Sequence, residues 1–180
     1  MKVIELDKPL TEDEYFLFEE KNELKHELIN NTLYEMSGIS KFHNRITLNI
    51  LVLLRAFLNT NMYDLYFEGY KVKTPGGNFF YPDVLICHAD ATKYYTEQPV
   101  LIVEVLSNTT RKFDLTDKFI QYQKIETLQY YLCVEPEKKA VIFYYKQDNE
   151  WIAETFTKDE ELISLPALNI SFRLKDIYNS

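Results

Sequence analysis

The sequence predicts an α/β domain in which helices flank a mixed β-sheet. Apolar runs typical of strands alternate with segments of helical periodicity, in the order helix, hairpin, helix, strands, helix, strands. Residues 99–106 (PVLIVEVL) show no polar alternation, so we expect a central strand that is covered on both faces. With 180 residues, 46% of them hydrophobic, the chain is expected to form one domain over residues 1–180.

The first third of the chain is predicted to contain a helix, a hairpin and a longer helix. Thr11 and Glu14 have capping-box spacing, which indicates a helix start after a short extended segment. Asn30 and Asn31 tolerate left-handed turn geometry, so the segment HELINNTLYEM is predicted to be a hairpin. Between residues 40 and 58 apolar residues recur at helical spacing, with Ser40 as the candidate cap.

The rest of the chain is predicted to be mainly strands, interrupted by one helix over residues 112–126. The strand-like segments before this helix are LYFEGYKVKT, FFYPDVLICH and PVLIVEVL. Those after it are LQYYLCVEP, AVIFYYK and WIAETFT, the last two joined by a polar QDNE turn. Pro75-Gly76-Gly77 is predicted to be a turn, and the C-terminal tail is short and mixed.

Composition and charge argue against several classes of protein. The net charge of −8 disfavours broad non-specific binding of nucleic acid, which depends on Lys and Arg. No GxGxxG and no GxxxxGK[ST] occurs, so a nucleotide cofactor has no support. We expect no secretory leader and no membrane span, because neither pattern is recognised in the sequence. Cys87 and Cys133 lie in apolar runs typical of the core. We therefore expect a reduced protein in the cytoplasm, with no membrane partner.

One carboxylate needs an explanation. Glu104 stands in the apolar run VLIVEVL, where an ionised side chain is strongly unfavourable unless it is paired, protonated or bound to a metal ion. Asp83 follows Pro82 at the start of another predicted strand, and neighbouring strands could bring the two carboxylates together. Hard divalent cations such as Mg²⁺ prefer oxygen ligands of this kind. The pair Asp83 and Glu104 is therefore a candidate metal site.

Lys118 is the candidate third member of this site. In the helix after the Glu104 strand, Asp114, Lys118 and either Gln121 or Tyr122 share one face, so Lys118 could point back over the strand and stabilise negative charge. Each residue also has a structural interpretation: Asp83 as a turn residue, Glu104 as one half of an ion pair, Lys118 as a solvated side chain and Tyr122 as a packing residue.

Several motifs together resemble a known family. YPDVLI, VLIVEVLSNTTRKFDLTDKFIQY and LQYYLCVEPEKKAVIFYY, preceded by HELINNTLYEMSGISKFHNRITLNIL, are similar to the Uma-type family of putative restriction endonucleases in the PD-(D/E)XK nuclease superfamily. The resemblance runs in order from Glu27 to Tyr145, and the block EVLS is its most distinctive part. It implies a restriction-endonuclease-like α/β core with a divalent-metal site.

Carried over residue by residue, the resemblance implies that Asp83 and Glu104 hold the metal. The superfamily lysine two residues after the second acid is absent, since that position is Leu106, and Lys118 fits the place of a lysine moved to the next helix. Glu27 and His43 match other recurrent positions and are accessory candidates. His43 also has a structural interpretation, as a residue bonded locally near a helix start. Asn31 replaces the glycine common in the family's hairpin.

These features predict a Mg²⁺-dependent (or Mn²⁺-dependent) endonuclease acting on DNA, with Asp83, Glu104 and Lys118 as catalytic residues. A homodimer would suit cleavage of both strands. Four basic residues flank the proposed cleft and are candidates for phosphate contacts: Lys41, Arg45, Arg111 and Lys112. Two alternatives stay open: a non-catalytic partner-binding protein on a nuclease fold with a relict acidic site, and a metal-free carboxylate-pair hydrolase such as a glycosidase.

Overall fold

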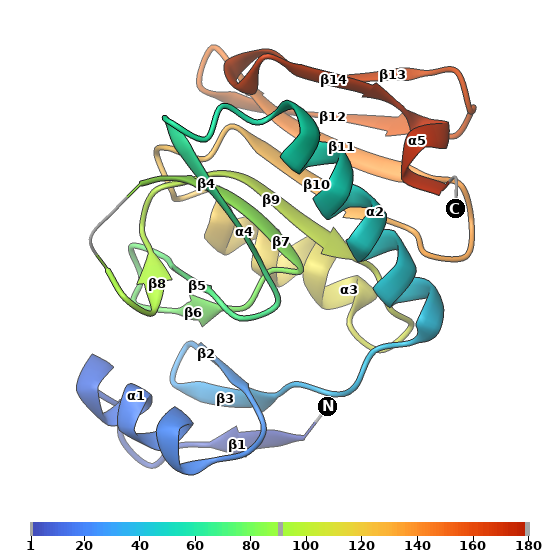
Figure 1. Cartoon of the computed structure of the whole chain (residues 1–180). Coiled ribbons are helices and arrows are strands. Elements are labelled where there is room, and N and C mark those ends of the chain that lie inside the picture. The colour runs from blue at the N-terminus through green and yellow to red at the C-terminus, as the bar shows by residue number, and fades with distance from the viewer. Residues whose placement is uncertain (1, 90–91, 179–180) are drawn as a thin grey trace.

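The computed structural model describes residues 2–89 and 92–178 (Figure 1). Its first elements are β1 (Val3–Glu5), α1 (Glu12–Lys21), β2 (His26–Ile29), β3 (Thr32–Glu35) and α2 (Lys41–Phe57). Strands then predominate: β4 (Tyr63–Phe67), β5 (Lys71–Lys73), β6 (Phe79–Phe80), β7 (Val84–His88), β8 (Tyr95–Thr96) and β9 (Pro99–Val105). The first elements agree with the predicted capped helix, hairpin and long helix.

The second half begins with one helical segment in three parts, α3 (Arg111–Phe113), the π-helical turn η1 (Asp114–Lys118) and α4 (Phe119–Tyr122). It continues with β10 (Tyr130–Val134), β11 (Val141–Gln147) and β12 (Glu150–Phe156). The chain then forms β13 (Leu162–Leu165), the 3₁₀ turn η2 (Pro166–Leu168), β14 (Ile170–Arg173) and α5 (Leu174–Tyr178). The β13–β14 hairpin and α5 were not predicted from the mixed tail.

The strands form two six-stranded sheets and one two-stranded sheet in the described residues, where the sequence predicted one mixed sheet. The first sheet has the order β1-β3-β2-β6-β5-β8 and the second β12-β11-β10-β9-β7-β4. Two predicted strand segments are each divided between these sheets. Glu68, with a φ of 49°, interrupts the first, and residues 81–83 interrupt the second. The α/β class was predicted correctly, whereas the separation into two sheets depends on these local breaks.

Strand β9 is the central strand that the sequence predicted. It lies between β10, which runs parallel to it, and β7, which runs antiparallel, and all seven of its residues are buried. Parallel pairing with β10 requires a crossover, and the helical segment α3–η1–α4 provides it. The residues on the central strand therefore face helices or packed loops on both sides of the sheet.

Helix α2 covers one face of the second sheet (Figure 1). Ser40 caps it by accepting the backbone N–H of His43, as the sequence predicted. Ile46, Ile50 and Leu54 recur every four residues and are buried in a core cluster that also contains β9 and β10 residues. The start of this helix is thus held beside the end of β9.

The opposite face of the second sheet is covered by α3–η1–α4 and by residues of the first sheet. The predicted helix extended to residue 126, but the observed one ends at Tyr122. The N–H of Lys124 donates to the carbonyl of Gln121, and the N–H of Ile125 donates to that of Tyr122. These hydrogen bonds span three residues instead of four, which tightens the last turn and ends the helix. Among the helices of residues 2–89 and 92–178, none has the length and apolar character that crossing a membrane requires.

Candidate active site

Asp83 lies at the entry to β7, after Pro82, which has no N–H to donate to a sheet. The antiparallel register of β7 and β9, extended by one residue, places Asp83 opposite Glu104. The Oδ2 atom of Asp83 accepts the backbone N–H of Val105 at 2.7 Å and lies 3.1 Å from Nε2 of His43. Asp83 is thereby fixed at the end of the sheet, between the central strand and the start of α2.

Glu104 points to the face of β9 that lies away from α2, the face it shares with Ile102 and Leu106. Its Oε1 atom accepts hydrogen bonds from Lys118 Nζ at 3.1 Å and from the Tyr122 hydroxyl at 3.2 Å. The charge in the apolar strand is therefore paired. Tyr122, predicted to pack, is fully buried and also bonds this carboxylate.

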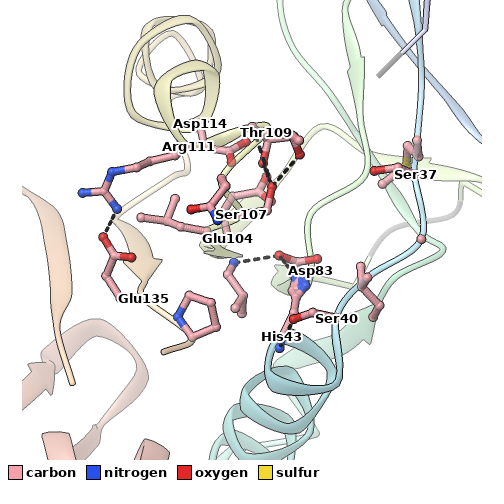
Figure 2. Close-up of a pocket in the computed structure, with 18 of the residues that line it drawn as sticks. Ser37, Ser40, His43, Asp83, Glu104, Ser107, Thr109, Arg111, Asp114 and Glu135 are labelled. Carbon is pink, nitrogen blue, oxygen red and sulfur yellow. Dashed lines mark hydrogen bonds and ion pairs between the residues drawn. The ribbon is translucent and has the colours of Figure 1, made fainter. Parts of the chain in front are cut away.

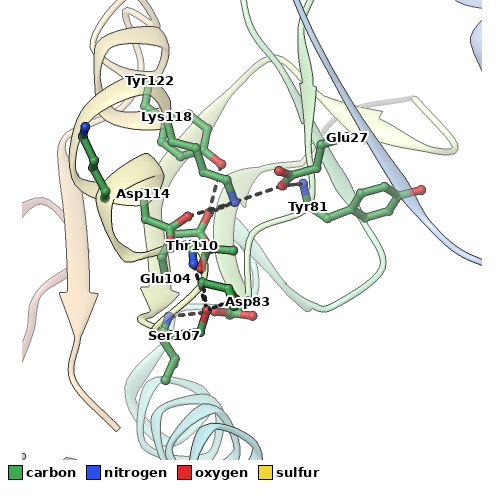
Figure 3. Close-up of polar contacts among 12 residues, drawn as sticks. Glu27, Tyr81, Asp83, Glu104, Ser107, Thr110, Asp114, Lys118 and Tyr122 are labelled. Carbon is green, nitrogen blue, oxygen red and sulfur yellow. Dashed lines mark hydrogen bonds and ion pairs between the residues drawn. The ribbon is translucent and has the colours of Figure 1, made fainter. Parts of the chain in front are cut away.

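Lys118 is held by three carboxylates (Figure 3). Its Nζ lies 2.9 Å from Glu27 Oε1, 3.1 Å from Glu104 Oε1 and 3.4 Å from Asp114 Oδ1. Asp114 and Lys118 begin and end the π-helical turn, a wider turn than an α-helical one and often found at functional sites. The Tyr131 hydroxyl donates to the carbonyl of Asp114 at 2.9 Å and anchors the start of this turn.

Burial and neighbouring charges decide the protonation of these groups. Burial raises the pKa of Glu104 well above its usual value, although the Lys118 charge opposes this. Burial also raises the pKa of Asp83, to about 7, against the Val105 N–H bond and Lys118. Burial disfavours the charge on Lys118, but the surrounding carboxylates outweigh it and raise its pKa. Burial lowers the pKa of His43 and so favours its neutral form.

The five residues singled out from the sequence line one pocket of about 510 Å³. They are Glu27, His43, Asp83, Glu104 and Lys118. Figure 2 shows His43, Asp83 and Glu104 in this pocket. Three segments complete the walls: residues 36–40 before α2, residues 106–111 after β9 and residues 135–138 after β10. The structure thus brings together residues that lie far apart in the sequence; their chemical roles stay predictions.

The four basic residues predicted to flank the cleft do not all line the pocket. Arg111 lines the pocket and forms an ion pair with Glu135 on the opposite segment of the wall. Lys41, Arg45 and Lys112 are exposed and lie outside the lining. Of the four, only Arg111 therefore belongs to the pocket itself.

Asp114 is a buried residue of the pocket that was not predicted to belong to the candidate site. It is 2% exposed and lines the pocket, and its Oδ1 has no hydrogen-bond partner among the described residues, the Lys118 ammonium at 3.4 Å being a charge contact. The available signal was its spacing of four residues from Lys118, which puts both side chains on one helix face. Nothing in the sequence showed that this face is buried.

The carboxylates in the pocket could bind a hard cation only if water or phosphate oxygens supplied the remaining ligands. No group of three or more His, Cys, Asp or Glu side chains within residues 2–89 and 92–178 is arranged to hold a metal ion. Mg²⁺ is commonly bound by one or two carboxylates, with water and phosphate oxygens filling the other positions. The carboxylates of Asp83 and Glu104, opposite one another at the end of the sheet, fit that pattern.

Comparison with known families agrees with the resemblance seen in the sequence. Residues 12–175 match the sequence profile of the Uma2 family, which is described as "Putative restriction endonuclease". Two proteins of Synechocystis sp., named "Uncharacterized protein sll1609" and "Uncharacterized protein slr1290", are 31% identical over 159 residues and 29% identical over 175 residues. The alignments cover 84% and 94% of this chain, and 90% and 91% of those proteins.

A solved structure shares the fold. It is the crystal structure from Anabaena variabilis of a "putative nuclease belonging to DUF820", with a TM-score of 0.78 and 18% sequence identity. The match covers 94% of this chain and 98% of that one. The predicted α/β fold class is therefore confirmed.

Proposed function

The chain belongs to the Uma2 family, and we propose that it is a Mg²⁺- or Mn²⁺-dependent endonuclease that hydrolyses DNA phosphodiester bonds in this pocket. One observation carries the proposal: the carboxylates of Asp83 and Glu104 and the ammonium of Lys118 meet in one pocket, although they come from separate elements. Structural lysines are common, but this one is buried against the same carboxylate that the metal hypothesis needs.

Asp83 and Glu104 would hold the divalent cation. Such a cation, when bound, lowers the pKa of a coordinated water and offsets the charge of the phosphate. His43 and the Val105 N–H hold Asp83 in place through its Oδ2 atom. The orientation of the first carboxylate is thus set before any substrate arrives.

Lys118 supplies a positive charge of fixed position. In hydrolysis, a water molecule gives up a proton to solvent as its oxygen forms a bond to phosphorus, one P–O ester bond breaks, and the leaving oxygen takes up a proton from solvent. Negative charge builds on the phosphoryl oxygens in the transition state, and the Lys118 ammonium stabilises it. Glu27 and Asp114 hold that ammonium on the sides not contacted by Glu104, so they are positioning residues.

A non-catalytic role on the same fold is the second candidate. It is favoured by the close pairing of Lys118, whose charge is already balanced by three carboxylates without any metal.

A single domain over residues 1–180, a cytoplasmic location and a homodimer stay predictions from the sequence.

Calorimetric titration with Mn²⁺, followed by DNA cleavage assays, tests the proposal. We expect the wild type to bind Mn²⁺, Asp83→Asn to lose binding, and Lys118→Ala to keep the metal but lose cleavage. Lys124→Ala, on an exposed lysine outside the pocket, is the matched control and should cut at the wild-type rate. Metal binding without cleavage of any DNA would support the non-catalytic role, and no metal binding even with DNA present would contradict the nuclease.

A further inference from the structure

The proposed catalytic residues lie at the bottom of the pocket. The exposed fraction of the side chain is 13% for Asp83, 5% for Glu104 and 7% for Lys118. The segments of residues 36–40, 106–111 and 135–138 stand around them. A scissile phosphate must therefore pass between these walls to reach Glu104.

The wall after β9 is stabilised by hydrogen bonds among its own side chains. The Ser107 hydroxyl lies 3.0 Å from that of Thr109 and 2.8 Å from that of Thr110, and it accepts the Thr110 N–H at 3.1 Å. Arg111, at the end of this wall, forms its ion pair with Glu135 of the wall after β10. The hydroxyl bonds order the first of these walls, and the ion pair joins it to the second.

The pocket also offers little positive charge to a polyanion. Three cations line it, against six carboxylates, and two of the cations, Arg111 and Lys118, are already ion-paired. Lys138 is the third, and no carboxylate of the described residues lies within ion-pair distance of it. Duplex binding depends on many lysine and arginine contacts to phosphates along both strands. This pocket can supply few of them.

We infer that the pocket takes an unpaired DNA strand, and that intact duplex is a poor substrate. This inference rests on the proposed nuclease function. A duplex is stiff, with a persistence length of about 150 base pairs, so its backbone cannot bend between the three wall segments to reach Glu104. A single strand, or a segment in which the bases are already unpaired, avoids the cost of unstacking and unpairing before its backbone enters.

The first experiment compares one oligonucleotide sequence in three forms: single strand, blunt duplex, and duplex with a central unpaired loop. With Mn²⁺, we expect the wild type to cut the single strand and the loop, and the blunt duplex about 100-fold more slowly. Equal rates on single strand and duplex would overturn the inference while leaving the nuclease proposal intact. No cleavage of any form would contradict the nuclease proposal, and the inference would fall with it.

A matched pair of variants tests whether the walls cause the selectivity. Arg111→Gln and Glu135→Gln each break the same ion pair but change the charge of the pocket in opposite directions. If the ion pair narrows the pocket, both variants should raise the rate on duplex relative to single strand. If Arg111 acts only through its charge, Arg111→Gln should slow all forms while Glu135→Gln speeds them. That result would overturn the role given to the walls.

Discussion

Two buried lysines of this protein are kept in different surroundings. Lys118, of which the whole residue is 5% exposed, is contacted by the carboxylates of Glu27, Glu104 and Asp114. Lys71, 6% exposed, has no carboxylate of the described residues within ion-pair distance. Burial alone therefore says little about what a lysine does.

Lys71 is surrounded by aromatic rings. Its Nζ lies 4.6 Å from the ring centroid of Tyr81, 5.1 Å from that of Phe16 and 5.9 Å from that of Tyr15. Burial lowers its pKa, whereas the carboxylates raise that of Lys118. Aromatic rings stabilise a cation but remain stable in the core when it is removed. Buried carboxylates that lose their cation are left as unpaired buried charges, which destabilises the folded state.

The largest expected effect comes from replacing each lysine by methionine. Lys118→Met should lower the free energy of unfolding at pH 8 by about 3–5 kcal/mol, because three buried carboxylates lose their cation. Lys71→Met should lower it by about 1 kcal/mol or less, because only ring contacts are lost. Urea denaturation measures both. Equal losses would remove the distinction drawn between the two regions.

The second effect concerns the carboxylate that Lys118 pairs with. Glu104→Gln should weaken Mn²⁺ binding more than about 100-fold. Such a loss exceeds the one expected for a residue that contacts a metal ligand without binding the metal itself. It should leave the free energy of unfolding unchanged or raise it, since a buried charge is removed. Calorimetry and urea denaturation measure these quantities, with the exposed Glu126→Gln as control. Unchanged Mn²⁺ affinity would exclude Glu104 as a ligand.

The third effect is a pH dependence set by Asp83. Because the Asp83 pKa is raised to about 7, a proton competes with metal at this carboxylate below pH 7. Mn²⁺ affinity should therefore rise about tenfold from pH 6 to pH 8. Asp83→Asn should show no such rise. An affinity that is flat over this range in the wild type would place the metal elsewhere.

The same shift predicts how the metal-free protein responds to pH. Between about pH 4 and pH 7 the folded state keeps a proton on Asp83 that the unfolded chain has released. The contribution of Asp83 to the free energy of unfolding therefore falls as the pH rises through this window. Comparing urea midpoints of the wild type and Asp83→Asn across it isolates that contribution.

The smallest effect is expected at Asp114, the third partner of Lys118. Asp114→Asn should keep metal binding and lower the free energy of unfolding by about 1 kcal/mol, since two carboxylates still hold the lysine. Cleavage should slow about tenfold, because the ammonium is held less firmly. Asp117→Asn, on the exposed side of the same turn, is the control. Identical cleavage rates for the two variants would remove Asp114 from the positioning of Lys118.

Local signals predicted the local structure well. The Thr11 capping box and the Ser40 cap are both present. Asn30 and Asn31 turn the hairpin with φ angles of 47° and 63°. Each of these features is decided within about four residues of chain, by side-chain bonds to nearby backbone groups or by the conformations that Asn tolerates. Such features can be predicted from the sequence because all the atoms involved are close together in the chain.

The candidate site could be predicted only in part from the sequence. The apolar run around Glu104 required a partner, and the helix spacing placed Lys118 over the same strand, but an ion pair was only one of the interpretations of Glu104. The contact between the two side chains is seen only in the structure. Asp114 could not be proposed as a buried partner, because its burial depends on packing against the sheet and on the Tyr131 bond.

The class of the fold, the central strand and the family could be predicted from the amino-acid sequence, because each is encoded in continuous runs of residues. The division of the strands into two sheets, and the π-helical turn that presents Lys118 to three carboxylates, are seen only in the folded chain. The same holds for the three distant segments that wall the pocket. These features arise from contacts between residues far apart in the chain, and no local pattern specifies such contacts.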